Sequence, residues 1–180
     1  NKIDLTINLA THYVFDHKPA DINQLVESNL QFGLNLLEAA TANGCLNFVN
    51  TSSYIQNYFS REFYPSCLYA VTKQALEDAI SYYATNKNLQ AITLKLFDVY
   101  GAKDRRKKIV NLFQESQINN TVLKMSPGNQ EIRLNHISDV LAAIFTAQEL
   151  LQNINAQHLI YYVGGEPVTV RQLAKIFEEV

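Results

Sequence analysis

The sequence predicts an α/β fold in which helices cover both faces of a parallel sheet, and three observations predict it. Segments rich in β-branched and aliphatic residues alternate with segments of helical periodicity, in the order strand 2–10, helix 22–43, strand 46–51, helix 65–84 and strand 91–97. The length of 180 residues and the hydrophobic fraction of 47% suffice for a domain with a core. Chemically useful polar side chains follow the predicted strands, at the edge where such sheets bind ligands. The β-α-β-α-β alternation is typical of a doubly wound parallel sheet.

The boundaries of the first helices rest on spacing and on terminators. Gly44 is a good terminator for helix 22–43. Pro65 suits the first turn of the second helix. The apolar residues of the first helix recur every three or four positions, and they are Ile22, Leu25, Val26, Leu30, Leu34, Leu37 and Ala40.

The regular alternation of predicted strands and helices changes after Gly101. We expect a helix with a basic head over 103–117, a short strand over 122–125, a helix over 139–151 and a strand over 158–163. Thr169 is a plausible N-cap for a final helix. This second part predicts a smaller α/β lobe from about residue 102 onward, with segments that return to the first sheet.

Composition excludes several classes of protein. Fifteen Lys and Arg against 17 Asp and Glu leave a net charge of −2, which does not favour a nucleic acid or an acidic membrane as partner. No apolar run reaches the ~18 residues that span a bilayer, and the first residues do not resemble a signal peptide. Cys45 and Cys67 have no CxxC spacing, and the four histidines are scattered, so we predict neither a disulfide framework nor a metal site. A cytoplasmic location is expected.

The glycine pattern bears on how such a sheet begins. The six glycines, at 33, 44, 101, 128, 164 and 165, form no G-x-G-x-x-G phosphate turn. We therefore expect the chain to begin late within the domain, with roughly two βαβ units of ~30 residues each preceding it in the complete fold.

The centre of chemical interest is Tyr69-Ala-Val-Thr-Lys73, a tyrosine and a lysine on one face of a helix. A phenol with a pKa near 10 is a weak acid or base at neutral pH, and a nearby ammonium is expected to lower that pKa. Tyr83 and Lys87 repeat the spacing at the far end of the same helix, and we interpret them as structural. Ser53, at the end of strand 46–51, offers a hydroxyl to a substrate carbonyl, although it could instead cap a turn.

These residues resemble those of the extended short-chain dehydrogenases/reductases, the NAD-dependent epimerase/dehydratase family. The resemblance extends over nearly the whole chain and implies a Rossmann-type fold. It rests on segments that match the family's motifs, namely Ile7-Asn-Leu-Ala10, Asn29 with Asn-Leu-Leu-Glu-Ala-Ala at 35–40, Thr51-Ser-Ser53, Tyr69 with Lys73, Leu96-Phe-Asp-Val-Tyr-Gly101, and Gly164-Gly-Glu-Pro-Val-Thr-Val170.

The resemblance implies roles for individual residues. The implied catalytic residues are Tyr69 as proton donor, Lys73 as its partner and ribose ligand, Ser53 as the group that holds the carbonyl oxygen, and Asn29 as the holder of a relay water. The implied ligand of the chain is NAD or NADP, and the implied cofactor-binding residues are Ala10, Thr51, Tyr69, Lys73 and Leu96. For a nucleotide-sugar substrate, the implied residues are Ser53, Asp98, which stands where asparagine is usual, and Arg133, whose register is one residue short. The basic run 103–108 is either a phosphate-binding segment or a solvated helix start.

The same resemblance implies a division of the chain and a reaction. Residues 1–101 correspond to the C-terminal part of the NAD(P)-binding domain and 102–180 mainly to the substrate lobe. Within the family the chain looks closest to CDP-abequose and CDP-paratose synthases, which implies reduction of a CDP-4-keto-dideoxyhexose for O-antigen or other cell-surface sugars. The alternatives are an epimerase, a dehydratase (disfavoured because Tyr54 and Ile55 follow Ser53 in place of an acidic pair) and a non-catalytic regulatory protein. A homodimer through the helices near 22–43 and 65–84 is also implied.

Overall fold

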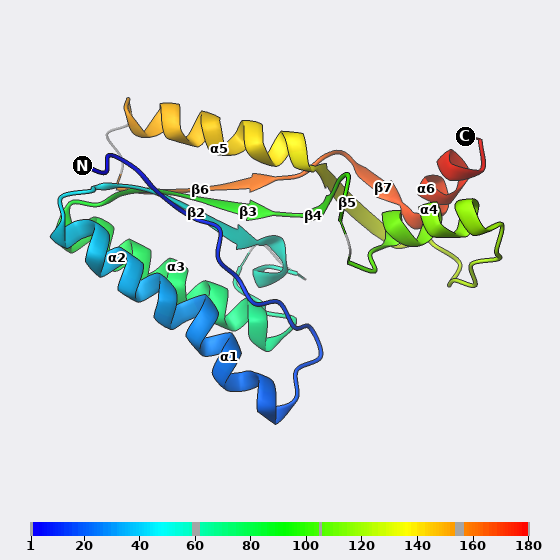
Figure 1. Ribbon diagram of the computed structural model, residues 1–180, viewed down its shortest axis with the longest axis horizontal. Coiled ribbons are helices and arrows are strands. Elements are labelled where there is room, and N and C mark those ends of the chain that lie inside the picture. The colour runs from blue at the N-terminus through cyan, green and yellow to red at the C-terminus, as the bar shows by residue number, and fades with distance from the viewer. Residues whose placement is uncertain (1, 59–61, 105, 154–156, 180) are drawn as a thin grey trace. The chain divides into compact units, whose positions relative to one another are not determined.

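The computed structural model describes residues 2–58, 62–104, 106–153 and 157–179. The chain forms two compact units. The first consists of Asn1–Leu96 and Ala142–Val163, and the second of Phe97–Leu141 and Gly164–Val180. Figure 1 shows the elements of both.

The first unit is built on four parallel strands in the order β1-β2-β3-β6. These are β1 (Thr6–Asn8), β2 (Asn47–Ser53), β3 (Gln90–Leu96) and β6 (His158–Val163). The two central strands are buried along most of their length, as expected of a parallel sheet that is covered on both faces. β1 is shorter than the predicted strand 2–10, because only three of its residues pair with β2. The predicted α/β class and parallel sheet are confirmed.

Helices cover both faces of this sheet (Figure 1). On one face lie α1 (Ile22–Val26), a π-helical turn η2 (Glu27–Gln31), α2 (Phe32–Ala42) and the long α3 (Leu68–Lys87). The greater part of α5 (Ile137–Leu151) covers the other face. Short 3-10 turns, η1 (Pro19–Asp21) and η3 (Tyr54–Gln56), precede α1 and follow β2. The core under α2 and α3 consists of Leu37, Phe48, Leu76, Ile80, Leu89 and Ala91.

One glycine allows α2 and α3 to pack closely. A Cβ atom at Gly33 would lie 2.5 Å from Leu76 Cδ1, well inside van der Waals contact. The absence of a side chain at Gly33 therefore brings the helix that carries Asn29 against the helix that carries Tyr69 and Lys73.

The second unit has a three-stranded sheet in the order β4-β5-β7, in which β4 and β5 are parallel and β5 and β7 antiparallel. Its strands are β4 (Asp98–Tyr100), β5 (Glu131–His136) and β7 (Pro167–Thr169). Two helices, α4 (Ile109–Asn119) and α6 (Val170–Glu178), belong to the same unit. The Thr169 hydroxyl accepts a hydrogen bond from the Gln172 N–H, which confirms the predicted N-cap.

The predicted strand at 122–125 is wrong. That segment has no strand pairing, and Val122 is 92% exposed. The strand of this region is β5, which was not predicted because four of its six residues, Glu131, Arg133, Asn135 and His136, are polar. β4 and β7 were missed as well, since three residues are too few to show a periodicity.

Two predicted helix starts are also wrong. Helix α3 begins at Leu68, not at Pro65, because Cys67 is fully extended (φ −160°, ψ 165°). Helix α4 begins at Ile109, so the basic run 103–108 precedes the helix and does not form its first turns. Lys103 adopts a left-handed conformation (φ 70°), which a right-handed helix does not accommodate. A helix through this run would also place the like charges of Lys103 and Lys107 one turn apart, where they repel.

The described residues include neither a membrane-spanning helix nor a metal-binding cluster. No helix among them is long and apolar enough to cross a membrane. Within the same ranges, no three His, Cys, Asp or Glu side chains gather where they could hold a metal ion.

Candidate active site

The carboxyl ends of the central strands bring several of the predicted site residues to one edge. Ser53 of β2 is in register with Leu96 of β3. The Thr51 hydroxyl donates to the Asn8 carbonyl oxygen (3.1 Å) and so ties β2 to β1. Just beyond β1, the Ala10 N–H donates to Asn8 Oδ1 (3.3 Å). Ala10, Thr51, Ser53 and Leu96 therefore share the edge at which parallel sheets bind ligands.

The two neighbouring serines differ in their contacts. Ser52 is buried, and its hydroxyl donates to Gln56 Oε1 at 2.5 Å. The backbone N–H of Ser53 donates to the same oxygen at 3.1 Å. Because the Ser52 hydroxyl is committed to Gln56, Ser53, half-buried at the last position of β2, is the better candidate to meet a substrate.

Tyr69 lies in the first turn of α3 and is only 6% exposed. The edge of the Tyr13 ring packs against its ring, with centroids 5.0 Å apart. The Thr11 hydroxyl lies 3.4 Å from the phenolic oxygen. Burial raises the pKa of Tyr69, the hydrogen bond from Thr11 lowers it, and the Cys67 thiol raises it further. The expectation that a neighbouring ammonium lowers this pKa is therefore not met in this structure, because burial dominates.

Lys73 follows Tyr69 by one helical turn and is 1% exposed. Among the described residues, neither a hydrogen-bond acceptor nor an ion-pair partner of its ammonium group is found. Burial lowers the pKa of Lys73 to about 8, and the carboxylate of Glu77 opposes that effect. A buried ammonium with unused donors suits a ligand that brings hydroxyl groups, such as a ribose.

Asn29 is buried in the π-helical turn η2 and joins two elements around Tyr69. Its Oδ1 atom accepts from the His12 N–H (2.7 Å) and from the Thr11 hydroxyl (3.2 Å). Its Nδ2 atom donates to the His12 carbonyl oxygen (2.9 Å) and to Thr72 Oγ1 (3.1 Å). Thr72 in turn donates to the Tyr69 carbonyl oxygen (2.8 Å). The Asn29 amide thus fixes the segment after β1 against α3.

The second Tyr-x-x-x-Lys pair has different surroundings. The Tyr83 hydroxyl donates to Glu38 Oε2 on α2 at 2.7 Å in an exposed position. This hydrogen bond to a carboxylate raises the pKa of Tyr83 to about 12. Lys87 is the last residue of α3. Neither side chain lies at the carboxyl edge of the sheet, which agrees with their structural interpretation.

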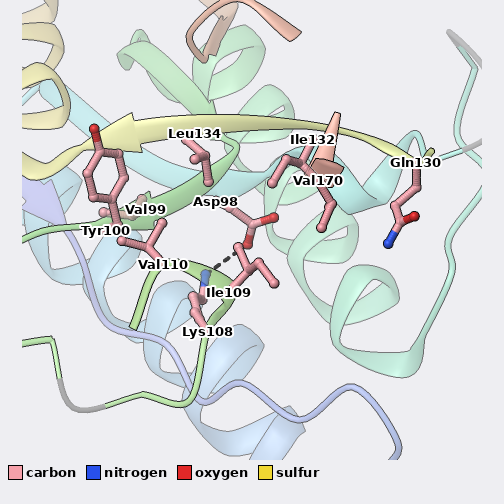
Figure 2. A pocket seen from close by; sticks show the side chains of 10 residues that line it. All are labelled: Asp98, Val99, Tyr100, Lys108, Ile109, Val110, Gln130, Ile132, Leu134 and Val170. Atoms are coloured by element: carbon pink, nitrogen blue, oxygen red, sulfur yellow. Dashed lines mark hydrogen bonds and ion pairs between the residues drawn. The ribbon is translucent and has the colours of Figure 1, made fainter. Parts of the chain in front are cut away.

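The second unit contains a pocket of about 270 Å³ (Figure 2). One of its walls carries an ion pair, in which Lys108 Nζ lies 2.9 Å from Asp98 Oδ1. The rest of the lining is mostly apolar and comprises Val99, Tyr100, Ile109, Val110, Gln130, Ile132, Leu134 and Val170. The predicted substrate residue Asp98 therefore lines a pocket, together with Lys108 from the basic run.

Arg133, the other predicted substrate residue, does not line this pocket. Its neighbours in β5, Ile132 and Leu134, do, and side chains alternate between the two faces of a strand. The Arg133 guanidinium donates to the Gly165 carbonyl oxygen (2.9 Å) and lies 5.7 Å from the centre of the Phe97 ring.

Sequence analysis missed several residues that organise the site. Thr11 directly follows the Ala10 motif, and its place beyond a strand end was a usable signal. Gln56 follows Ser53 at the Ser-x-x-Gln spacing of a capping box, which was also a usable signal. The buried Glu77–Lys95 pair gave no such signal, because its two members belong to different elements.

Comparison with known proteins yields two sets of relatives. The chain is 32% identical over 142 residues to a CDP-abequose synthase of Yersinia pseudotuberculosis, a match that covers 78% of this chain and 50% of that protein. It is 24% identical over 178 residues to a CDP-abequose synthase of Salmonella muenchen, which covers 98% of this chain and 59% of that protein. The chain thus spans between half and three-fifths of the length of these curated relatives.

Solved structures share the fold. A UDP-glucuronic acid 4-epimerase from Bacillus cereus in complex with NAD superposes with a TM-score of 0.87 at 21% identity, over 98% of this chain and 59% of that one. MoeE5 in complex with UDP-glucose and NAD gives a TM-score of 0.83 at 22% identity, over 98% of this chain and 62% of that one.

The family model described as "NAD dependent epimerase/dehydratase family" matches residues 1–164. That match takes in the strand ends, Asn29, Tyr69 and Lys73. The chain therefore belongs to the NAD-dependent epimerase/dehydratase family.

Proposed function

We propose that the protein is an NAD(P)-dependent reductase of a nucleotide-diphosphate keto-sugar, and that a CDP-4-keto-dideoxyhexose is its substrate. One observation carries the proposal, namely that Tyr69 and Lys73, one turn apart on α3, are both buried, and that the Lys73 ammonium has no hydrogen-bond or ion-pair partner among the described residues. The two groups lie in the first turns of α3. Gln74 of the same helix accepts a hydrogen bond from Gln56, which in turn accepts one from the Ser53 N–H. The relatives named CDP-abequose synthase support the choice of nucleotide.

The residues divide the chemistry of carbonyl reduction among them. When bound, a reduced nicotinamide supplies the hydride that forms the new C–H bond. Tyr69 gives its phenolic proton to the carbonyl oxygen, and Ser53 donates a hydrogen bond to that same oxygen. Lys73 binds ribose hydroxyl groups and stabilises the tyrosinate that remains. Ala10, Thr51 and Leu96 line the strand ends against which the nicotinamide half would be held.

The pocket of the second unit is proposed to take the nucleotide portion of the substrate. Its apolar walls suit a base, and Lys108 suits a phosphate once it leaves Asp98. Lys108 is favoured over Arg133 as the phosphate-binding cation, because the Arg133 guanidinium contacts Gly165 and Phe97. Asn29 is proposed to act by holding the Thr11–His12 segment. Its amide already makes four hydrogen bonds, with Thr11, His12 and Thr72, so the relay water that the family resemblance implies has no free position on it.

The wider setting is also proposed. A CDP-linked product fits the biosynthesis of O-antigen or other cell-surface sugars in the cytoplasm. We further propose a homodimer through α2 and α3, where the apolar side chains of Phe32 (47% exposed) and Val71 (41% exposed) reach the surface.

Consumption of NAD(P)H at 340 nm, measured on the full-length gene product with CDP-4-keto-dideoxyhexoses, tests the reaction. We expect one NADH or NADPH to be oxidised per sugar reduced. Tyr69→Phe should lower kcat by about 10²- to 10⁴-fold, the usual contribution of a positioned general acid. Tyr83→Phe is the matched control, because it removes a phenol with the same lysine spacing, and it should leave turnover unchanged.

Other outcomes point to the alternatives. Interconversion of sugars without net consumption of NAD(P)H, detected by NMR, would mean that the protein is an epimerase. Loss of water from the sugar would indicate a dehydratase. Turnover that survives in Tyr69→Phe would contradict the tyrosine mechanism, and ligand binding without any turnover in the wild type would indicate a regulatory protein.

A further inference from the structure

The phenolic oxygen of Tyr69 has one neighbour whose chemistry the proposed mechanism does not use. Thr11 Oγ1 lies 3.4 Å from Tyr69 Oη and 3.2 Å from Asn29 Oδ1. The first distance is long for a hydroxyl pair, as is common in sites that tighten only around bound substrate. Thr11 lies three residues beyond β1, so it reaches the phenol from the same sheet edge as Ala10.

The orientation of the Asn29 amide decides what Thr11 can do. The His12 N–H donates to Oδ1 and the His12 carbonyl accepts from Nδ2, so the two backbone groups allow one orientation of the amide. The atom that faces Thr11 is therefore an acceptor. The Thr11 hydroxyl has one proton and two lone pairs. It can donate to Asn29 and accept from a neutral Tyr69, or rotate and donate to a tyrosinate.

We propose that Thr11 is a positioning residue for Tyr69, a hydroxyl that pairs with both protonation states of the phenol and favours the tyrosinate. This inference rests on the proposed role of Tyr69 as proton donor. The Asn29 amide holds the Thr11–His12 segment in reach, and the Tyr13 ring packs against the Tyr69 ring. Val14 packs against the apolar cluster to which Tyr69 belongs. The segment that follows β1 therefore packs against one side of Tyr69.

The other groups around Tyr69 do not replace Thr11. From α3 and its N-cap come the Lys73 ammonium and the Cys67 thiol, from the segment after β1 the Tyr13 ring, and from α1 and η3 the apolar Leu25 and Ile55. Burial and Cys67 raise the pKa of Tyr69, and the hydrogen bond from Thr11 opposes them. Removing the Thr11 hydroxyl therefore removes a stabiliser of the charged form, which raises the pKa of the phenol.

The test is a direct titration of Tyr69 in the full-length gene product. Tyrosine labelled with ¹³C at Cζ reports phenol ionisation by NMR, and Tyr69→Phe identifies the signal. Thr11→Val keeps the shape of the side chain and should raise the titration midpoint by about one pH unit, a tenfold change in the ionisation constant. Thr11→Ser keeps the hydroxyl and should restore the wild-type midpoint. Thr85→Val, which removes an exposed hydroxyl from α3, is the control and should change nothing.

The outcomes separate this inference from the proposed function. An unchanged midpoint in Thr11→Val, or in Thr11→Ala if the valine variant does not fold, would overturn the inference whatever the activity. A shifted midpoint that serine restores supports it, and the alkaline limb of the kcat profile should then shift in the same direction. Full turnover in Tyr69→Phe would refute the proposed function and leave the titration result standing. A purely structural Thr11 would lower the thermal midpoint without moving the titration.

Discussion

Glu77 of α3 and Lys95 of β3 form a buried ion pair, with Oε1 and Nζ 3.0 Å apart and each side chain only 5% exposed. Further hydrogen bonds satisfy the two charges. Lys95 donates to Asn57 Oδ1 at 3.0 Å, and Gln56 Nε2 lies 3.4 Å from Glu77 Oε2. The pair links α3 to the central sheet, and through Gln56 it reaches the backbone of Ser53.

Lys95→Met should destabilise the protein strongly, because it leaves the Glu77 carboxylate buried without its partner. The expected loss is about 3–5 kcal/mol of unfolding free energy in urea titrations. The double variant Glu77→Leu/Lys95→Met removes both charges and should recover most of that loss. If Lys95→Met were as stable as the wild type, water would have to reach the Glu77 carboxylate.

Gln56→Leu should reduce both stability and turnover. The side-chain oxygen of Gln56 accepts hydrogen bonds from the Ser52 hydroxyl and the Ser53 N–H, and leucine would leave both donors without an acceptor. We expect a loss of about 1–3 kcal/mol in unfolding free energy, and a fall in kcat larger than the change in KM, since Ser53 would lose its fixed position.

Gln74→Ala is the matched control for Gln56→Leu, because it removes the acceptor of Gln56 Nε2, together with an exposed hydrogen bond to Asp78, and leaves the serine contacts intact. Its kcat should remain near the wild-type value. Equal losses of kcat in the two variants would contradict a role of Gln56 in positioning Ser53.

Lys73→Met should stabilise the protein while abolishing turnover. Burial holds the pKa of Lys73 near 8, which means that the folded state disfavours the ammonium. A methionine of similar length removes that penalty, and we expect a gain of about 1–3 kcal/mol in unfolding free energy without cofactor. Lys87→Met, at the end of the same helix, should change stability by less than about 0.5 kcal/mol. A destabilised Lys73→Met would show that Lys73 contributes mainly to packing.

His158 should make stability depend on pH in mildly acidic solution. Burial, with a contribution from Lys95, lowers the pKa of His158 to about 4, against 6.5 in the unfolded chain. Its ring nitrogens lie 2.9 Å from the Ser81 and Thr93 hydroxyl oxygens. Between these two pKa values the unfolded state binds more protons. The stabilisation is therefore complete above pH 6.5 and is lost as the pH falls toward 4, by at most about 1.4 kcal/mol per pH unit.

His158→Gln keeps a polar side chain that does not titrate, so its unfolding free energy should vary less with pH in that window. Urea titrations of both proteins at pH 4.5, 5.5 and 6.5 compare the slopes. Parallel slopes would assign the acid sensitivity to other groups. His136→Gln is a suitable control, because His136 belongs to the second unit and its ring contacts the adjacent Ser138.

The parallel sheet and the edge with Ser53 could be predicted because their signals are local. Strands of apolar residues alternate with amphipathic helices, and the ends of parallel strands must meet at one edge. Tyr69 and Lys73 needed only helical spacing and proximity to that edge. The strand at 131–136 could not be recognised, because its polar residues are tolerated only where β4 and β7 satisfy its backbone.

The sequence by itself therefore determined the class of fold and the sheet edge at which the strands end, and it singled out the candidate tyrosine, lysine and serine. Only the tertiary structure decided which of the two adjacent serine hydroxyls is committed to Gln56, that Arg133 faces away from the pocket, and that Thr11 lies beside the Tyr69 phenol. The physical reason is the distance along the sequence over which each effect acts. Periodicity and turn chemistry act within about one element of secondary structure, whereas hydrogen bonds and burial join residues that are tens of positions apart and exist only once the chain has packed.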